Sequence, residues 1–284
     1  MLSADLEILI RTALAEDIGS GDITTSCTVP PGAQGKGRIV AKEPLVLAGV
    51  DVAAQVFWAV NRELEVHIPL KDGSRANEGD TLLEVMGDLA AILMAERTAL
   101  NFLQRLSGIA TLTRAFVDKI GGTRARILDT RKTTPGYRLL EKAAVRVGGG
   151  YNHRFGLYDG VLIKDNHIVA AGSIHKAVQA ALDSKAHALR VEVEVETLDQ
   201  LTEAIAAGAH VVMLDNMDLH TMAEAVRRAK GKVPLEASGG ITLENVGEIA
   251  ATGVDLISIG ALTHSARAVD MSMEIEPTQK AHIL

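Results

Sequence analysis

Residues 190–216, RVEVEVETLDQLTEAIAAGAHVVMLDN, contain a strand, a helix and a second strand in succession. The β-branched residues of Arg190–Val193 and His210–Leu214 predict the two strands. Between them, apolar residues recur at helical spacing, Thr197 stands where a helix N-cap belongs, and Gly208 stands where the helix should end. This pattern predicts a βα unit whose two strands run parallel.

The same alternation continues on both sides of this unit. Four further segments have the composition of short buried strands: Arg126–Leu128, Gly160–Ile163, Pro234–Ala237 and Asp255–Ile259. Helical patterns separate them, and N-caps are expected at Ser173, Asp218 and Thr242. The second half of the chain is therefore expected to be α/β, either a βα barrel or an open parallel sheet.

The first hundred residues have a different pattern, typical of an α+β domain. Helices are expected at Ala4–Ala15, Asp51–Val60 and Asp88–Arg105, strands at Gly37–Lys42, Leu64–Ile68 and Thr81–Val85, and a loop at Ile18–Gly37. The turn-rich segment 72–80 is similar to the hammerhead of biotinyl and lipoyl carrier domains, but no lysine stands in a matching hairpin to carry a prosthetic group. We expect domains at 1–107 and 108–269, with segment 270–284 joining the first.

Composition excludes several classes of protein. With 47% hydrophobic and 23% charged residues, the chain is expected to fold into a globular structure. Cys27 is the single cysteine, which excludes an intramolecular disulfide and is compatible with a reducing cytoplasm, where we expect the protein. No apolar run is long enough for a membrane helix, and no export signal is visible. A net charge of −7 and 3% aromatic residues argue against nucleic-acid binding.

Charged side chains gather where the predicted strands end. Between Arg97 and Lys164 there are 13 lysines and arginines against 4 acidic residues, although the whole chain is acidic. The carboxyl ends of parallel strands meet at one face, and ligands bind there. The residues just after the strands include Arg131, Lys132, Lys164, Glu194 and Asp215. The sequence thus predicts a polar pocket for an anionic ligand.

Two glycine-containing turns indicate a phosphate site in this pocket. Ser238-Gly239-Gly240 and Gly260-Ala261 come after the last two strands, and glycine lets the backbone approach an anion closely. Two carboxylates near an anion indicate a bridging Mg²⁺ or bonds to sugar hydroxyls. Glu192, Glu194 and Glu196 alternate along one strand, so the residue that contacts the ligand stays open among the three.

The triple glycine 148–150 precedes two further candidate ligands, His153 and Arg154. Arginine binds carboxylates through two parallel hydrogen bonds, and the flexible backbone before it would let both side chains reach a ligand. By contrast, Lys142 and Arg146 lie at helical spacing and are expected to be a solvated stripe.

Three long motifs resemble those of the quinolinate phosphoribosyltransferase family. They are DTRKTTPG at 129–136, GGGYNHR at 148–154 and IKDNH at 163–167, with shorter matches at 95–98, 106–111, 214–216 and 238–241. The similarity runs from about Asp17 to Met273. Tyr137 and Ala144 depart from the residues frequent in the family, but neither is a charged ligand.

The resemblance implies an N-terminal α/β sandwich and a βα barrel with fewer than eight strands. It also implies a cytoplasmic enzyme of NAD biosynthesis that joins quinolinate to phosphoribosyl pyrophosphate with loss of CO₂, uses Mg²⁺, and forms a homodimer in which Arg97 reaches the partner's barrel. The implied roles are carboxylate binding by Arg97, Arg131, His153 and Arg154; contact with both substrates by Lys132 and Lys164; Mg²⁺ or ribose binding by Glu194 and Asp215; and 5-phosphate binding by Ser238, Gly239, Gly240, Gly260 and Ala261.

Three alternatives to this activity stay open. A paralogue of the same fold is found with molybdate-transport genes, and nicotinate phosphoribosyltransferase handles one carboxylate rather than two. The set of Arg131, His153, Arg154 and Lys164 favours the quinolinate enzyme over the paralogue, and the surplus of arginine favours the dicarboxylate over nicotinate. A non-catalytic binding or carrier protein is the third alternative, and assembly beyond a dimer is also left open.

Overall fold

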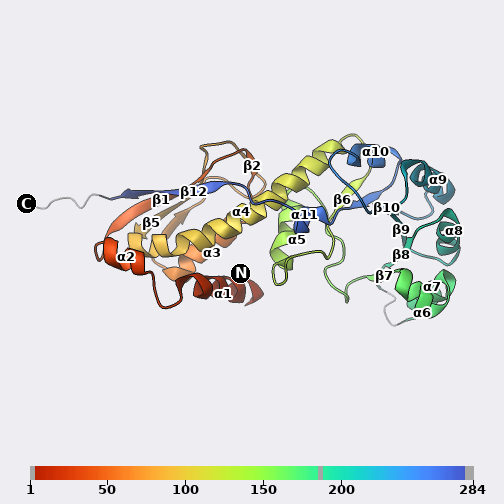
Figure 1. Cartoon of the computed structure of the whole chain (residues 1–284), viewed down its shortest axis with the longest axis horizontal. Helices are drawn as coiled ribbons and strands as arrows, with labels where there is room; N and C mark the ends of the chain where they lie inside the picture. Colours follow the sequence, from red (N-terminus) through yellow and green to blue (C-terminus); the bar gives the residue numbers. More distant parts are fainter. Residues whose placement is uncertain (1–3, 185–187, 279–284) are drawn as a thin grey trace, which may run out of the picture. The chain divides into compact units, whose positions relative to one another are not determined.

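The computed structural model describes residues 4–184 and 188–278 and divides into two compact units (Figure 1). Unit 1 comprises Met1–Thr111, Leu139–Gly148 and Ala266–Leu284, and unit 2 comprises Leu112–Arg138 and Gly149–Ser265. These limits differ from the expected boundaries after residues 107 and 269. The first limit falls inside helix α4 (Leu89–Lys119), and Leu139–Gly148 belongs to unit 1 instead of the barrel.

Unit 2 is built on a six-stranded parallel sheet with the order β6-β11-β10-β9-β8-β7. Its strands are β6 (Arg126–Leu128), β7 (Val161–Ile163), β8 (Val191–Val195), β9 (Val211–Asp215), β10 (Leu235–Ser238) and β11 (Leu256–Ser258). All six predicted strands are therefore confirmed, and so is the expectation of fewer than eight. Beside β6, Tyr151 forms an isolated parallel bridge with Leu128.

Among the described residues, six helices of unit 2 come after β7 or later strands of this sheet. They are α6 (Asp165–Ala171), α7 (Ile174–Leu182), α8 (Leu198–Ala206), α9 (Leu219–Ala229), α10 (Val246–Ala251) and α11 (Ala261–His264). Helices α7, α8 and α9 lie side by side along the outside of β8, β9 and β10 (Figure 1). The strands pack against them through fully buried side chains such as Val193, Leu214 and Ala237.

The predicted helix caps of unit 2 are largely confirmed. The side chains of Ser173, Thr197 and Asp218 each accept a hydrogen bond from a backbone N–H in the first turn of α7, α8 and α9. Gly208, just after α8, has a φ of 89°. The prediction for Thr242 is wrong, because α10 begins later and Asn245 is its N-cap.

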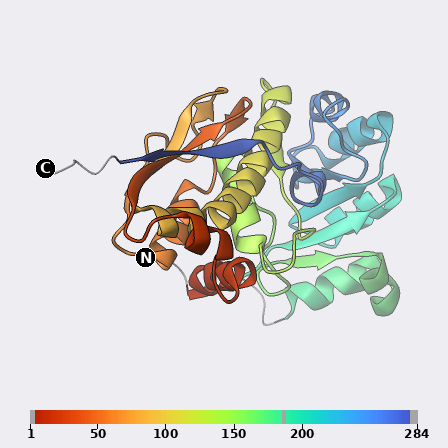
Figure 2. The same cartoon turned by 60° about the vertical axis from the view of Figure 1, so that its left-hand side comes forward.

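Unit 1 contains a four-stranded antiparallel sheet with the order β12-β1-β5-β3. Its strands are β1 (Gln34–Ala41), β3 (Glu65–His67), β5 (Thr81–Asp88) and β12 (Met271–Pro277), and β2 (Leu45–Val46) pairs separately with β4 (Arg75–Ala76). Segment 270–284 thus contributes β12, which lies alongside β1 (Figure 2). Residues 279–284 of that segment lie outside the described residues.

The helices of unit 1 are longer and more numerous than the sequence predicts. Helix α1 (Ala4–Ile18) extends past Ala15, and α3 is Val50–Val60. The expected loop contains a short helix, α2 (Ile23–Thr28), whose first turn is capped by Asp22. Asp72, in the turn-rich segment, accepts hydrogen bonds from the backbone N–H groups of Gly49 and Val50 at the start of α3.

The prediction that Lys142 and Arg146 form a solvated stripe is wrong for Lys142. Both residues lie in helix α5 (Arg138–Val147). Lys142 is buried with 3% exposure, whereas Arg146 is exposed. The neighbouring Glu141 is fully buried and accepts hydrogen bonds from Arg105 Nη2 at 2.8 Å and Nε at 3.2 Å. An ion pair with α4 therefore allows the charged side of α5 to be buried in unit 1.

Candidate functional site

A cavity of about 830 Å³ opens at the carboxyl ends of the strands of unit 2. Twelve of the thirteen predicted site residues line it: Arg131, Lys132, His153, Arg154, Lys164, Glu194, Asp215, Ser238, Gly239, Gly240, Gly260 and Ala261. The remaining one, Arg97, is an exposed residue of α4 in unit 1. The parallel sheet thus brings together side chains that lie up to 130 positions apart in the chain.

Of the three alternating glutamates, Glu194 is the one that lines this cavity. Its Oε2 accepts a hydrogen bond from Lys164 Nζ at 2.6 Å, and its side chain is 15% exposed. Glu192 lies deeper in β8, where its Oε2 is 2.9 Å from His153 Nε2. Glu196 comes just after β8 and is exposed.

Asp215 brings a second carboxylate to the same cavity. In the ladder between β8 and β9, Glu194 lies opposite Met213, and Asp215 is two residues further along the same face of β9. Asp215 Oδ2 accepts a hydrogen bond from Asn216 Nδ2 at 2.9 Å. The two carboxylates supply the oxygen ligands that Mg²⁺ prefers, so the donor set fits this ion.

The glycines after β10 form a tightly packed turn at the edge of the cavity. Gly239 has a φ of 93°, and a Cβ atom there would lie 2.1 Å from Asn216 Oδ1. Gly240 has a φ of 61°, and its carbonyl accepts a hydrogen bond from Asn245 Nδ2 at 2.9 Å. A side chain at position 239 would require a strained backbone conformation and a displacement of the Asn216 side chain, so glycine is strongly favoured there.

A second glycine turn holds Lys132. A Cβ atom at Gly260 would lie 3.0 Å from Lys132 Cδ, so the lysine stem passes directly over this glycine. The Lys132 carbonyl accepts a hydrogen bond from Thr263 Oγ1 at 2.7 Å, which fixes the backbone after β6 to helix α11. Lys132, which lines the cavity, therefore extends from a backbone that is held in place.

Asp129 anchors the loop that carries His153 and Arg154. This buried carboxylate comes directly after β6 and accepts hydrogen bonds from the His153 backbone N–H at 2.9 Å and from Asn152 Nδ2 at 2.5 Å. Arg154 Nη1 donates to the Gly160 carbonyl at 3.0 Å. Burial, and then the nearby charge of Arg131, lower the pKa of Arg154. Two guanidinium groups therefore make this side of the cavity strongly cationic.

Below the cavity lies a buried acidic pair, Glu192 and Glu236, of which sequence reasoning missed Glu236. Glu236 of β10 is 1% exposed, and its Oε1 is 3.7 Å from His153 Nε2. Burial, and then the charge of Glu192, raise the pKa of Glu236 to about 8. The sequence did contain a signal for this residue: a glutamate between Leu235 and Ala237 in a predicted buried strand is unusual and indicates a specific role. The cavity also includes residues that sequence reasoning did not select, among them Thr242, Ser258 and His264.

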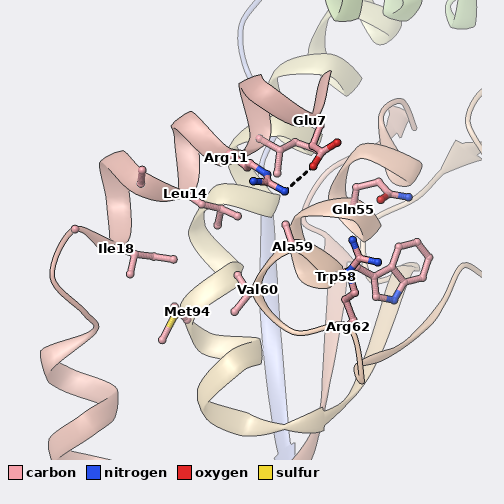
Figure 3. Close-up of a pocket in the computed structure, with 13 residues that line it drawn as sticks. Glu7, Arg11, Leu14, Ile18, Gln55, Trp58, Ala59, Val60, Arg62 and Met94 are labelled. Atoms are coloured by element: carbon pink, nitrogen blue, oxygen red, sulfur yellow. Dashed lines mark hydrogen bonds and ion pairs between the residues drawn. The ribbon is translucent and has the colours of Figure 1, made fainter. Parts of the chain in front are cut away.

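A second cavity, of about 950 Å³, lies in unit 1 between α1, α3 and α4 (Figure 3). Its lining is largely apolar, with Leu14, Trp58 and Met94 facing it. Glu7 and Arg11 at its rim form an ion pair at 2.7 Å. None of the predicted site residues lines this cavity, so the first cavity is the candidate active site.

Comparisons with known proteins show what the whole chain is similar to. Residues 22–107 match the family model described as "Quinolinate phosphoribosyl transferase, N-terminal domain", and residues 109–274 match the corresponding C-terminal domain. A probable nicotinate-nucleotide pyrophosphorylase [carboxylating] of Bacillus subtilis is 46% identical over 95% of this chain and 93% of the relative. A nicotinate-nucleotide pyrophosphorylase [carboxylating] of Mycobacterium leprae is 47% identical over 94% of this chain and 95% of the relative.

The fold is also similar to a solved structure. The nicotinate-nucleotide pyrophosphorylase of Francisella tularensis has a TM-score of 0.94 and 42% identity, covering 97% of this chain and 98% of that one. Within residues 4–184 and 188–278, no helix is both long and apolar enough to span a bilayer.

Proposed function

This chain belongs to the quinolinate phosphoribosyltransferase family, and on that basis we propose that it joins quinolinate to phosphoribosyl pyrophosphate with loss of CO₂. The products are nicotinate mononucleotide and pyrophosphate, which places the reaction in NAD biosynthesis. One observation carries the proposal: a single cavity combines two arginines, two lysines, two carboxylates and two glycine turns. A phosphorylated sugar and an aromatic dicarboxylate together require these groups.

The cationic side of the cavity suits the dicarboxylate. Arg131 and Arg154 are close enough for the charge of one to lower the pKa of the other, and a bound dianion would relieve that repulsion. Lys132 and Lys164 line the same cavity and would contact negative charges of both substrates. A substrate with one carboxylate would use fewer of these cations, which favours quinolinate over nicotinate.

The glycine turns suit the 5-phosphate of the sugar. Ser238, Gly239 and Gly240 on one strand end, and Gly260 and Ala261 on the next, line the cavity side by side. Close backbone approach and free N–H groups are the features by which glycine turns bind phosphate. The ribose would then extend from this edge toward Glu194 and Asp215.

The first chemical step is displacement at C1 of the ribose. The ring nitrogen of quinolinate forms a bond to C1, the C1–oxygen bond breaks, and pyrophosphate leaves with the electron pair. Positive charge develops on the sugar in this step, and the carboxylates of Glu194 and Asp215 would stabilise it or hold the ribose hydroxyls. These two residues would also hold Mg²⁺, which when bound neutralises the charge of the pyrophosphate group.

The second step is loss of the carboxylate next to the ring nitrogen. The bond between this carboxylate and the ring carbon breaks, CO₂ leaves, and the electron pair stays on a carbon adjacent to the now cationic nitrogen. A proton from solvent then completes the product. The protein contributes positioning and charge, with no covalent intermediate.

We include a homodimer and a cytoplasmic location in the proposal. Arg97 is exposed on α4, and we assign it to the carboxylate site of a second copy of this chain. A free, exposed Cys27 is compatible with a reducing compartment.

A turnover assay tests the proposal. The purified protein is incubated with quinolinate, phosphoribosyl pyrophosphate and Mg²⁺, and nicotinate mononucleotide and CO₂ are measured. We expect product only when all three are present, and none when nicotinate replaces quinolinate. Product from nicotinate would instead favour nicotinate phosphoribosyltransferase. No product from a folded protein would favour the molybdate-locus paralogue or a binding role.

A further inference from the structure

Both ring nitrogens of His153 are engaged by the protein itself. The backbone N–H of Arg154 donates a hydrogen bond to Nδ1 at 2.8 Å, and Nε2 lies 2.9 Å from Glu192 Oε2. A backbone N–H can only donate, so Nδ1 must be the unprotonated, accepting nitrogen. The ring proton of His153 is therefore on Nε2, where it is donated to Glu192.

This geometry leaves His153 without a ring N–H for a substrate. An imidazolium would place a proton on Nδ1 directly against the N–H of Arg154, so the geometry favours the neutral ring. The side chain is also only 13% exposed, although its residue lines the cavity. The role that the family resemblance implies, direct binding of a quinolinate carboxylate, does not fit these contacts.

Resting on the proposed function, we propose that His153 is a positioning residue, fixed by Glu192, that orients Arg154 for the substrate carboxylates. Glu192 holds the ring through Nε2, and the ring holds the backbone at residue 154 through Nδ1. The guanidinium of Arg154 is fixed at its other end by the Gly160 carbonyl. Arg154 then enters the cavity with few alternative orientations, which lowers the cost of ordering it when a ligand binds.

A divalent cation is the competing occupant of this cluster. Potential ligand atoms of His153, Glu192 and Glu236 all lie within 4.8 Å of one another. However, a metal bound to Nε2 would need that nitrogen unprotonated, and the ring proton would then be on Nδ1. The N–H of Arg154 faces Nδ1, so the tautomer that suits a metal is opposed by the backbone.

A double-mutant cycle separates positioning from direct binding. We would measure the KM and the equilibrium Kd for quinolinate in wild type, His153→Ala, Arg154→Ala and the double variant. If His153 acts through Arg154, His153→Ala weakens quinolinate binding about 10-fold or more, and the same change has no further effect once Arg154 is absent. Two effects that multiply in the double variant would overturn the proposal.

Two substitutions at Glu192 provide a matched pair. Glu192→Gln keeps an oxygen that can accept the Nε2 proton, whereas Glu192→Ala removes it. We expect Glu192→Ala to weaken quinolinate binding to the same extent as His153→Ala, with the KM for phosphoribosyl pyrophosphate unchanged, and Glu192→Gln to restore most of the affinity. Equal losses in both variants, or equal losses for both substrates at an unchanged Tm, would overturn the proposal.

The tautomer itself is measured by ¹⁵N NMR of histidine-labelled protein, with His153→Gln to assign the signal. We expect a protonated Nε2 and an unprotonated Nδ1, and a proton on Nδ1 would overturn the proposal. Because NMR and Kd need no turnover, these results separate the two proposals. A wild-type protein that binds quinolinate but forms no product contradicts the proposed function alone, and a multiplicative cycle in an active enzyme contradicts the positioning role alone.

Discussion

Lys164 and Glu194 form an ion pair inside the candidate active site, with Lys164 Nζ donating to Glu194 Oε2 at 2.6 Å. They stand at the ends of the neighbouring strands β7 and β8. The pair is partly exposed, with 46% of the lysine side chain accessible, so water and ligands can compete for both charges. An anionic substrate can therefore take Lys164 as a partner while Glu194 turns to the sugar or to Mg²⁺.

We expect Lys164→Ala to lower kcat/KM by roughly 100-fold or more, because it removes a charge that contacts the substrates' anionic groups. Lys176→Ala is the matched control, since Lys176 is an exposed lysine of α7 outside the cavity lining. Steady-state kinetics with both substrates and a Tm measurement check the pair. Equal activity in the two variants would contradict the role of Lys164.

Arg131→Ala and Lys132→Ala should each cost orders of magnitude in kcat/KM without unfolding the protein. Both side chains are exposed in the cavity, and the backbone contact of Lys132 with Thr263 does not depend on its side chain. Arg228→Ala, which breaks a surface pair with Glu224 on α9, should leave kinetics unchanged. Near-normal activity of both Arg131→Ala and Lys132→Ala would mean that the site assignment is wrong.

Gly239→Ala should weaken the binding of phosphoribosyl pyrophosphate. Its Cβ would lie 2.1 Å from Asn216 Oδ1 in addition to the strain of a φ of 93°. Gly231→Ala controls for the strain alone, because Gly231 has a φ of 72° and nothing lies within 4 Å of its Cβ. We expect both variants to lose about 1 to 3 kcal/mol of stability, but only Gly239→Ala to raise the KM for phosphoribosyl pyrophosphate. A similar KM in both would contradict the phosphate assignment.

The parts of the fold that local pattern determines are predictable from the sequence. The strands β6 to β11 are short segments rich in apolar residues, separated by helical patterns, and the parallel sheet then places the residues at their carboxyl ends in one cavity. Helix α4 continues to Lys119, well past the predicted end at Arg105. Gly108 lies inside α4, where a Cβ would be 2.0 Å from the Arg267 carbonyl, so this glycine serves close packing.

The features that sequence reasoning missed depend on tertiary partners. Strands β2 and β4 have two residues each and exist through their pairing with one another. Lys142 is buried because α5 packs in unit 1 beside the Arg105–Glu141 pair. Likewise, no spacing rule connects His153 with Glu192 and Glu236, which come from a loop and two strands.

Mixing two inactive variants tests whether Arg97 acts in a second copy of the chain. We expect Arg97→Ala and Arg131→Ala each to be nearly inactive. In a random mixture of protomers, half of the dimers pair the two variants, and each such dimer has one intact site, so about a quarter of wild-type activity should return. Co-purification of untagged Arg131→Ala with affinity-tagged Arg97→Ala demonstrates that the protomers have exchanged. No recovery after demonstrated exchange would contradict a site shared between protomers.

Glu236 should make the protein less stable as pH rises from about 4.5 to about 8. Its pKa is raised from 4.5 to about 8 by burial, so in this range the folded protein holds a proton that the unfolded chain has released. The free energy of unfolding then falls by up to roughly 1.4 kcal/mol per pH unit, and this loss ends above the folded pKa.

The variant Glu236→Gln tests this prediction, because its side chain is neutral at every pH, like the protonated glutamate. The free energy of unfolding of Glu236→Gln minus that of wild type should therefore increase as pH rises. Urea unfolding across the range measures the difference, and exposed Glu196→Gln should track the wild-type curve. Parallel curves for Glu236→Gln and wild type would show that Glu236 is ionised in the folded protein.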